Sequence, residues 1–288
     1  MPAMSGTAGL GKASIQALAS RGPSHIYFTG RNAKAGETLI AEIKTANPSV
    51  GLTFLEMDFL SLASVKKGCD QFAHNRLDVL MCNAGIMFKP PALSQDGYEA
   101  TFATNHLAHA LIIKLLLPTL QKTAENPSSD VRLISLTSEG WSGHPRQGVN
   151  FSTLQTTQDS IFGKLTRQSK LANIVYAAEV ARRYPQIMAV SVHPGVVKTD
   201  LVNSLSLSEK ALVYGANLVM GVTLMEEKQG CLSQLWVAAG ARRDQLVNGA
   251  YYRPVGVMSD STLDKIAISE EFAGKLWAWT DEAVARFL

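Results

Sequence analysis

The sequence predicts a doubly wound parallel α/β sheet, and two observations lead to this prediction. Apolar, β-branched segments alternate along the chain with segments of helical period. The apolar segments are apolar nearly throughout, which is typical of strands buried on both faces of a parallel sheet. The predicted strands lie within HIYFTGR (25–31), GLTFLEMDF (51–59), LDVLMCNAG (77–85), VRLISLTS (131–138) and IMAVSVHPG (187–195).

Helical segments follow these strands, as the fold requires. One begins at about Ala33, one near Leu62, and another surrounds Lys170. A long helix runs through TNHLAHALIIKLLL (104–117). Its most apolar part is interrupted by charge and is shorter than the roughly 20 residues that cross a bilayer, so we expect a core helix and no membrane span.

Composition places the chain among ordinary globular proteins. With 288 residues, 46% of them hydrophobic and 18% charged, we expect a single domain over 1–288. The net charge of +3 is small and the basic residues are scattered, which argues against a nucleic-acid partner. The three cysteines lie far apart and predict neither a disulfide framework nor a metal site. Their spacing, with no secretory signal at the N-terminus, favours a cytoplasmic location.

The beginning of the chain departs from the expected pattern. A doubly wound sheet carries its first strand just before a glycine-rich turn, yet four residues precede Ser5. We therefore expect a truncated first strand, whose loss would leave two neighbouring strands with unpaired edges. A chain truncated in this way could also fail to fold.

Ligands of such sheets bind beyond the carboxyl ends of the strands. Small polar residues and glycines follow several predicted strands, and we expect a binding site along this edge. The segment SGTAGLGKA (5–13) places three glycines ahead of a helix, where free backbone N–H groups and the helix dipole could hold a pyrophosphate. A flexible tail leading into a helix is the alternative.

Six motifs in order carry a family resemblance. They are Gly9-Leu10-Gly11, NAG (83–85), Asn105, Ser138, SKLAN (169–173) and HPG (193–195). Over essentially the whole chain they resemble the short-chain dehydrogenase/reductase family, and NHLAH, QSKLAN and GAYYRPVG are most similar to its retinol-dehydrogenase-like branch, fungal members in particular. The resemblance implies a Rossmann domain that transfers hydride between a nicotinamide and a carbonyl or alcohol carbon. It also allows a homo-oligomer, which many relatives form.

The cofactor would be NADP(H), because Arg31 follows the second predicted strand, where a guanidinium can bind a ribose 2′-phosphate. A surface arginine is the alternative. The resemblance assigns the pyrophosphate to Gly9, Leu10 and Gly11, with Ser5 in place of the motif's first glycine. The other residues that the resemblance implies for the cofactor are Asp58 for the adenine amino group, Asn83 for the adenosine ribose, Val197 and Thr199 for the carboxamide and pyrophosphate, and Lys170 for the nicotinamide ribose. Asp58 could instead cap the next helix, and Asn83 could brace the sheet.

The resemblance also implies the catalytic residues. Ser138 would hold the substrate oxygen, and the amide of Asn105 would help to hold a water that links Lys170 to solvent. A serine satisfied at a strand end and an asparagine at a helix kink are the alternatives. Relatives carry a tyrosine four residues before the lysine, on the same helix face, and here Thr166 occupies that position. Its hydroxyl has a far higher pKa than a phenol, so Thr166 could donate a hydrogen bond or position a water for proton transfer from Lys170.

We therefore expect a slow NADP(H)-dependent oxidoreductase for a moderately large, apolar small molecule, in secondary metabolism or lipid-carbonyl chemistry. The apolar amphipathic segment at about 201–230 would be its substrate lid. The alternative is an NADP-binding protein of the same fold without redox turnover, a pseudoenzyme or a non-redox isomerase or cyclase, which Thr166 favours.

Overall fold

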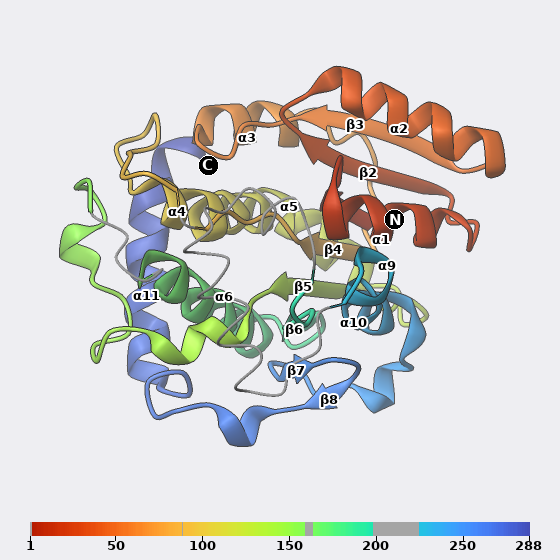
Figure 1. The fold of residues 1–288 in the computed structure, drawn as a ribbon. Coiled ribbons are helices and arrows are strands. Elements are labelled where there is room, and N and C mark those ends of the chain that lie inside the picture. Colours follow the sequence, from red (N-terminus) through yellow and green to blue (C-terminus); the bar gives the residue numbers. More distant parts are fainter. Residues whose placement is uncertain (1, 88, 159–163, 198–224) are drawn as a thin grey trace.

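The computed structural model describes residues 2–87, 89–158, 164–197 and 225–288, which form one eight-stranded sheet with helices on both faces (Figure 1). The strand order is β3-β2-β1-β4-β5-β6-β7-β8, and only the β7–β8 pair is antiparallel among these strands. The strands are β1 (Pro2–Ser5), β2 (His25–Gly30), β3 (Gly51–Glu56), β4 (Val79–Cys82), β5 (Arg132–Leu136), β6 (Met188–Val192), β7 (Tyr251–Arg253) and β8 (Val257–Met258). The doubly wound parallel fold predicted from the sequence is confirmed.

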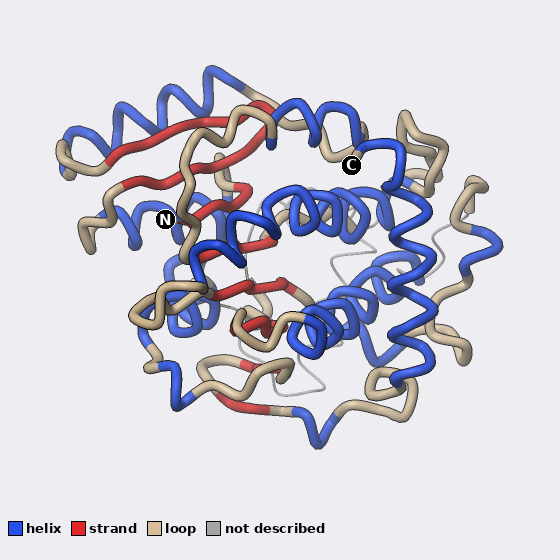
Figure 2. Tube along the Cα trace, turned by 180° about the vertical axis from the view of Figure 1, so that it is seen from behind, coloured by secondary structure: helices blue, strands red, loops and turns tan. Residues whose placement is uncertain are grey.

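The helices connect successive strands and cover the sheet, as the view from behind shows (Figure 2). They are α1 (Gly9–Ala19), α2 (Ala33–Ala46), α3 (Leu62–Cys69), α4 (Ala100–Phe102), α5 (Ala108–Ala124), α6 (Lys164–Arg183), α9 (Glu227–Gly230), α10 (Leu232–Leu235) and α11 (Glu270–Val284). A π-helical turn, Ala103–Leu107, joins α4 to α5. A short 3₁₀ helix, Glu139–Gly143, follows β5.

The first strand is short, but it is not lost. The four residues of β1 pair in parallel with β2 on one side and with β4 on the other. Met4 is aligned with Phe28 of β2 and with Met81 of β4. The expectation of two unpaired strand edges at the centre of the sheet is therefore wrong, because four extended residues already provide backbone partners for both neighbours.

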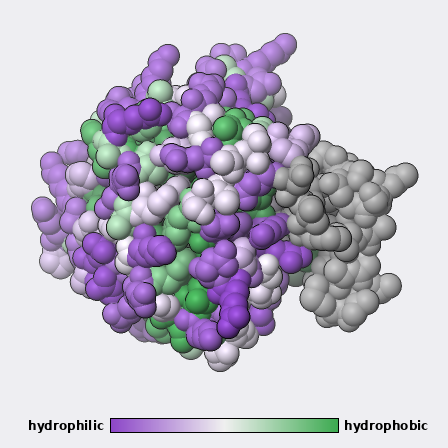
Figure 3. Space-filling model, turned by 90° about the vertical axis from the view of Figure 1, so that its left-hand side faces the viewer, coloured by the Kyte–Doolittle hydropathy of each residue, from purple (hydrophilic) through white to green (hydrophobic). Residues whose placement is uncertain are grey.

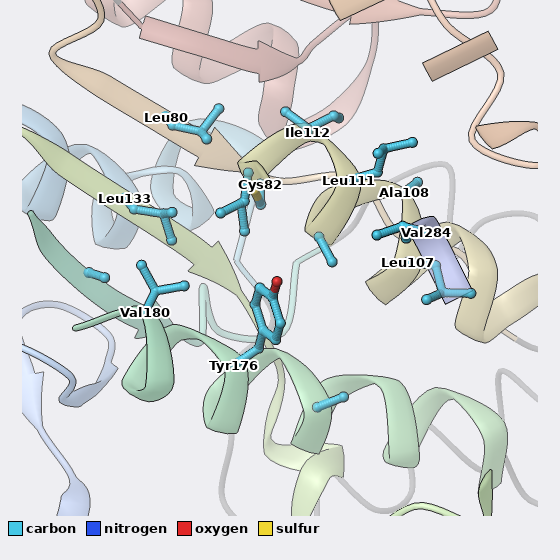
Figure 4. Close-up of a cluster of buried hydrophobic side chains, with 14 of the residues drawn as sticks. Leu80, Cys82, Leu107, Ala108, Leu111, Ile112, Leu133, Tyr176, Val180 and Val284 are labelled. Carbon is cyan, nitrogen blue, oxygen red and sulfur yellow. The ribbon is translucent and has the colours of Figure 1, made fainter. Parts of the chain in front are cut away.

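Buried side chains form one apolar cluster on each face of the sheet. Successive strand residues point to opposite faces, so Tyr27 packs in the cluster beneath α3, α5 and α6, whereas Ile26 and Phe28 pack in the cluster with α1 and α2. Figure 4 shows part of the first cluster, in which Tyr176 of α6 points toward α5 among residues of β4 and β5. These two apolar layers fix the helices and thereby the loops at the strand ends.

Among the described residues, the helix Ala100–Ala124 is long and apolar enough to cross a bilayer, but 83% of its most apolar window is buried inside the protein. Such burial is typical of a core helix, as the sequence predicted. Seen from the left-hand side of Figure 1, the surface is mainly hydrophilic with hydrophobic residues between the polar ones (Figure 3). This is the usual composition of a folded surface.

Candidate functional site

Helix α1 begins at the glycine-rich turn with its first N–H groups uncapped by side chains. The side chains of Asn32, Ser61 and Ser269 cap α2, α3 and α11, whereas Ala8 gives α1 no side-chain hydrogen bond. Gly9 has a φ of +55°, a conformation that favours glycine. Free N–H groups at a helix N-terminus fit the phosphates of a dinucleotide.

Gly6 compensates in part for the missing first glycine at Ser5. Its N–H donates to the carbonyl oxygen of Thr29 at 2.9 Å, which continues the pairing of β1 with β2. A Cβ atom at position 6 would lie 2.0 Å from Cδ1 of Ile15 in α1, so a larger residue there would require the Ile15 side chain to move. Gly11 is buried and Leu10 half-buried in the first turns of the helix.

A groove of about 380 Å³ lies between the glycine-rich turn with α1 on one side and α2 on the other. It is lined by Thr7, Lys12, Asn32, Lys34, Ala35, Thr38, Leu39 and Glu42. Arg31 comes directly before the lining residue Asn32 in the chain and is exposed. It forms no ion pair with another described residue. Lys12 is paired with Glu42 at 2.8 Å across the groove. The exposed Arg31 and Lys34 make this groove suitable for an anionic group.

Asp58 does not cap the helix that follows it, contrary to the alternative considered from the sequence. Ser61 caps α3 by accepting from the N–H of Ser64, and Asp58 uses Oδ1 to accept from the N–H of Leu60 at 3.0 Å. This bond holds the turn after β3 and keeps the carboxylate beside the strand ends. Asn83, which follows β4, is half-buried.

Lys170 projects from α6 toward the end of β5. Its Nζ donates to the carbonyl oxygen of Leu136 at 3.0 Å, and Asn173 Nδ2, one turn later, donates to the same oxygen. The hydroxyl of Thr137 donates a hydrogen bond to the carbonyl oxygen of Lys170 at 2.8 Å. Removal of the ammonium from water by burial lowers the pKa of Lys170 to about 8.

Asn105 connects the loop after β4 to α6. Its Oδ1 accepts from the N–H of Ile86 at 2.7 Å, while Nδ2 donates to the Ile86 carbonyl oxygen at 3.0 Å and to Ser169 Oγ at 2.9 Å. Both amide protons are therefore used, and no proton of this amide is left for the water that the resemblance implied. Asn105 lies in the π-helical turn, where a kink-forming asparagine was the alternative, and its side chain positions the loop.

The loop after β4 approaches this pair closely. A Cβ atom at Gly85 would lie 3.3 Å from Asn105 Oδ1 and 3.4 Å from Lys170 Nζ. Three candidate residues from separate elements thus meet at the carboxyl edge of the sheet.

Thr166 lies on α6 one turn before Lys170, as the sequence predicted. Its carbonyl oxygen accepts from Ser169 Oγ at 2.8 Å, but its own Oγ1 is buried without a hydrogen-bond partner in the described structure. A buried hydroxyl without a partner is costly and is usually satisfied by a water or ligand. Among the described residues, nothing occupies the hydrogen-bonding capacity of this hydroxyl.

Ser138 follows β5, half-buried, in an extended conformation. The next residue, Glu139, belongs to a polar network that the sequence did not reveal. Glu139 accepts from the Tyr251 hydroxyl at 2.5 Å and from Arg253 through Nε at 2.7 Å and one terminal nitrogen at 2.8 Å. Both partners lie on β7, within the GAYYRPVG segment. This network fixes the backbone immediately after Ser138.

The electrostatic surroundings also include two buried histidines. Burial lowers the pKa of His109 to about 3, with Lys170 contributing, and that of His193 to about 4, partly offset by Glu139. Despite burial, the bonds from Tyr251 and Arg253 hold the pKa of Glu139 below its ordinary value. Both histidines are thus neutral and Glu139 is ionised at neutral pH.

The segment after β6 is described only in part. Val197 is buried and forms a parallel bridge with Met225, and α9 follows shortly after. Thr199 and residues 201–224 of the expected lid lie outside the described residues.

Comparisons with known proteins agree with this geometry. The family model for short chain dehydrogenase matches residues 4–139. An uncharacterized oxidoreductase of Schizosaccharomyces pombe, C736.13, is 32% identical over 260 residues, covering 86% of this chain and 74% of that protein.

Solved structures show the same fold. An uncharacterized protein from Mycobacterium paratuberculosis is similar with a TM-score of 0.72 and 23% identity, covering 99% of this chain and 92% of that one. YwfH, an NADPH dependent reductase involved in bacilysin biosynthesis, is similar with a TM-score of 0.66 and 17% identity, covering 88% and 96% of the two chains.

Proposed function

Because the chain belongs to the short-chain dehydrogenase family, we propose that it is an NADP(H)-dependent oxidoreductase acting on a carbonyl or alcohol of a moderately large, apolar small molecule. One observation carries the proposal: Lys170, Asn105 and Gly85 meet at the carboxyl edge of the sheet. This is the edge at which doubly wound sheets bind their ligands. The fungal relative supports the class of reaction, since it is described as an oxidoreductase.

The residues present fit a dinucleotide. The uncapped N-terminus of α1 would hold the pyrophosphate, and the exposed Arg31 would bind a 2′-phosphate. The unused Oδ2 of Asp58 would accept from the adenine amino group, with Asn83 at the ribose. Val197 and Thr199 would lie toward the carboxamide. Bound NADPH would supply the hydride.

The chain's own residues would then orient the substrate. Ser138 would donate to the substrate oxygen, and Lys170 would contact the nicotinamide ribose. Asn105 and Ser169 would keep the loop after β4 against α6. Positioning of this kind can sustain hydride transfer even where general acid catalysis is weak.

The substitution Thr166→Tyr tests the proposal against the alternative of an NADP-binding protein without redox turnover. A phenol at this position would restore a general acid, which typically contributes about 10²–10⁴-fold to the rate. We expect NADPH-dependent reduction of hydrophobic ketones and aldehydes, measured by product chromatography, to rise by about that factor.

Thr45→Tyr is the matched control, because Thr45 is an exposed helical threonine on α2. If the parent chain and the Thr166→Tyr variant both bind NADPH but neither reduces any of these carbonyls, the pocket serves a non-redox purpose. The retinol-dehydrogenase-like branch, the metabolic pathway and the cytoplasmic location remain predictions.

A further inference from the structure

Few of the described groups around Ser138 have a proton to donate. The Tyr251 hydroxyl donates to Glu139, which together with burial raises the pKa of Tyr251 above its ordinary value. His193 is neutral at physiological pH because burial depresses its pKa. Arg253 retains its proton at any physiological pH. Tyr176 is stacked on Trp277 within the apolar core (Figure 4), and burial raises its pKa well above the ordinary value.

Lys170 differs from all of these. Its ammonium has three N–H donors, and one of them is used by Leu136. The titratable groups that interact with its charge are His109 on α5 and His193, which directly follows β6. Both histidines are neutral at neutral pH, and Glu139 interacts with His193 in turn. No carboxylate forms an ion pair with this ammonium among the described residues. Burial without an anionic partner makes its proton easier to release near neutral pH.

The Thr166 hydroxyl can hold a water molecule between this lysine and the substrate. Residues four apart on a helix lie on the same face, so the unpartnered Oγ1 of Thr166 is on the Lys170 face of α6. A water bound to this hydroxyl would occupy space that a longer side chain would fill. The Ser169 bond to the Thr166 carbonyl oxygen keeps this turn of the helix fixed against Asn105.

We propose that Lys170 is itself the proton donor in carbonyl reduction, through a water held by Thr166. The proposal rests on the oxidoreductase function proposed above. As the carbonyl carbon accepts the hydride, its oxygen gains a proton from that water, and the water takes one from the Lys170 ammonium. An O–H bond forms, an N–H bond breaks, and the neutral amine regains its proton from solvent. Alcohol oxidation would use the neutral amine as the base.

The pH dependence of turnover tests this role. At saturating NADPH, we expect kcat for reduction to be level below about pH 8 and to fall about tenfold per pH unit above it, because the protonated lysine is the acid. The neighbouring His109 and His193 have pKa values far below this range, so their titration does not contribute to the fall in kcat. Thr166→Tyr should move the break in the profile, since a phenol then donates the proton.

Lys170→Arg separates proton donation from binding. A guanidinium keeps the positive charge and the donors but does not release a proton. We expect at least a 100-fold loss of reduction, while the NADPH dissociation constant from fluorescence titration stays within a few-fold. Lys164→Arg, at an exposed position on the same helix, should change neither quantity.

Two further measurements guard against an unfolded variant or an indirect effect. In Lys170→Ala, added ethylammonium should restore part of the rate, and the rescue should follow the protonated fraction of the amine. ¹³C-lysine NMR of the cofactor-free chain, assigned with Lys170→Arg, should show one lysine that titrates near pH 8.

Reduction that stays level to pH 10, or Lys170→Arg with full turnover, would assign the proton to another donor and overturn this role alone. A chain that shows no NADPH-linked turnover at any pH would overturn the proposed function and this role together.

Discussion

At position 166 a threonine stands where the family resemblance implies a phenol. Its hydroxyl is buried and has no hydrogen-bond partner among the described residues, whereas the backbone around it is held by Ser169 and Asn105. The lysine one turn later keeps its contacts to the end of β5. A threonine at this position is therefore compatible with an ordered helix turn and with the contact of Lys170 to β5.

Arg31 gives a second test at the residue scale. A charge-assisted hydrogen bond is worth about 1.5–3 kcal/mol, so Arg31→Asp should weaken NADPH binding by about 10- to 100-fold and leave NADH binding equal or tighter. Isothermal titration with both nucleotides measures this. Arg21→Asp, an exposed arginine after α1, is the control. Equal losses for NADPH and NADH would show that Arg31 does not read the 2′-phosphate.

At the scale of elements, the π-helical turn, the loop after β4 and α6 are joined through one side chain. Asn105 is fully buried, and its amide satisfies the N–H and the carbonyl oxygen of Ile86 together with Ser169. Asn105→Ala leaves these groups without partners, and each buried unsatisfied group costs about 1–3 kcal/mol. We expect the free energy of unfolding in urea to fall by about 2–4 kcal/mol.

Asn126→Ala, in an exposed turn, should lower it by well under 1 kcal/mol. If Asn105→Ala lowers the free energy of unfolding no more than Asn126→Ala does, water replaces the amide. The hydrogen bonds of Asn105 to Ile86 and Ser169 then contribute little to stability.

For the whole molecule, three buried histidines link stability to pH. Burial lowers the pKa of His106 and His193 to about 4 and that of His109 to about 3. The unfolded chain, with histidine pKa values near 6.5, binds more protons than the folded chain between pH 6.5 and these values. The free energy of unfolding should therefore decrease by several kcal/mol as pH falls from 6.5 to 5.

Urea unfolding at several pH values measures this dependence. His106→Gln, which keeps a polar contact for Thr280, should flatten the curve in proportion to one titrating group. A stability that stays constant over this range would show that these histidines are hydrated in the folded state.

The sequence predicted the strands well where burial on both faces made them continuously apolar, as in β2, β5 and β6. It failed at β1, because four residues are too few for a pattern and their partners come from distant segments. Site residues at strand ends could be expected from the fold. The Glu139 network could not, because Arg253 lies 114 residues away in the chain.

The central claim is that this fold binds NADP(H) at the carboxyl edge of its sheet for redox chemistry, and a thermal melt of the purified chain tests it most directly. A ligand that binds only the folded state raises the melting temperature. We predict a clear increase with saturating NADPH and a smaller one or none with NADH. A cooperative melt that neither nucleotide shifts would contradict the account.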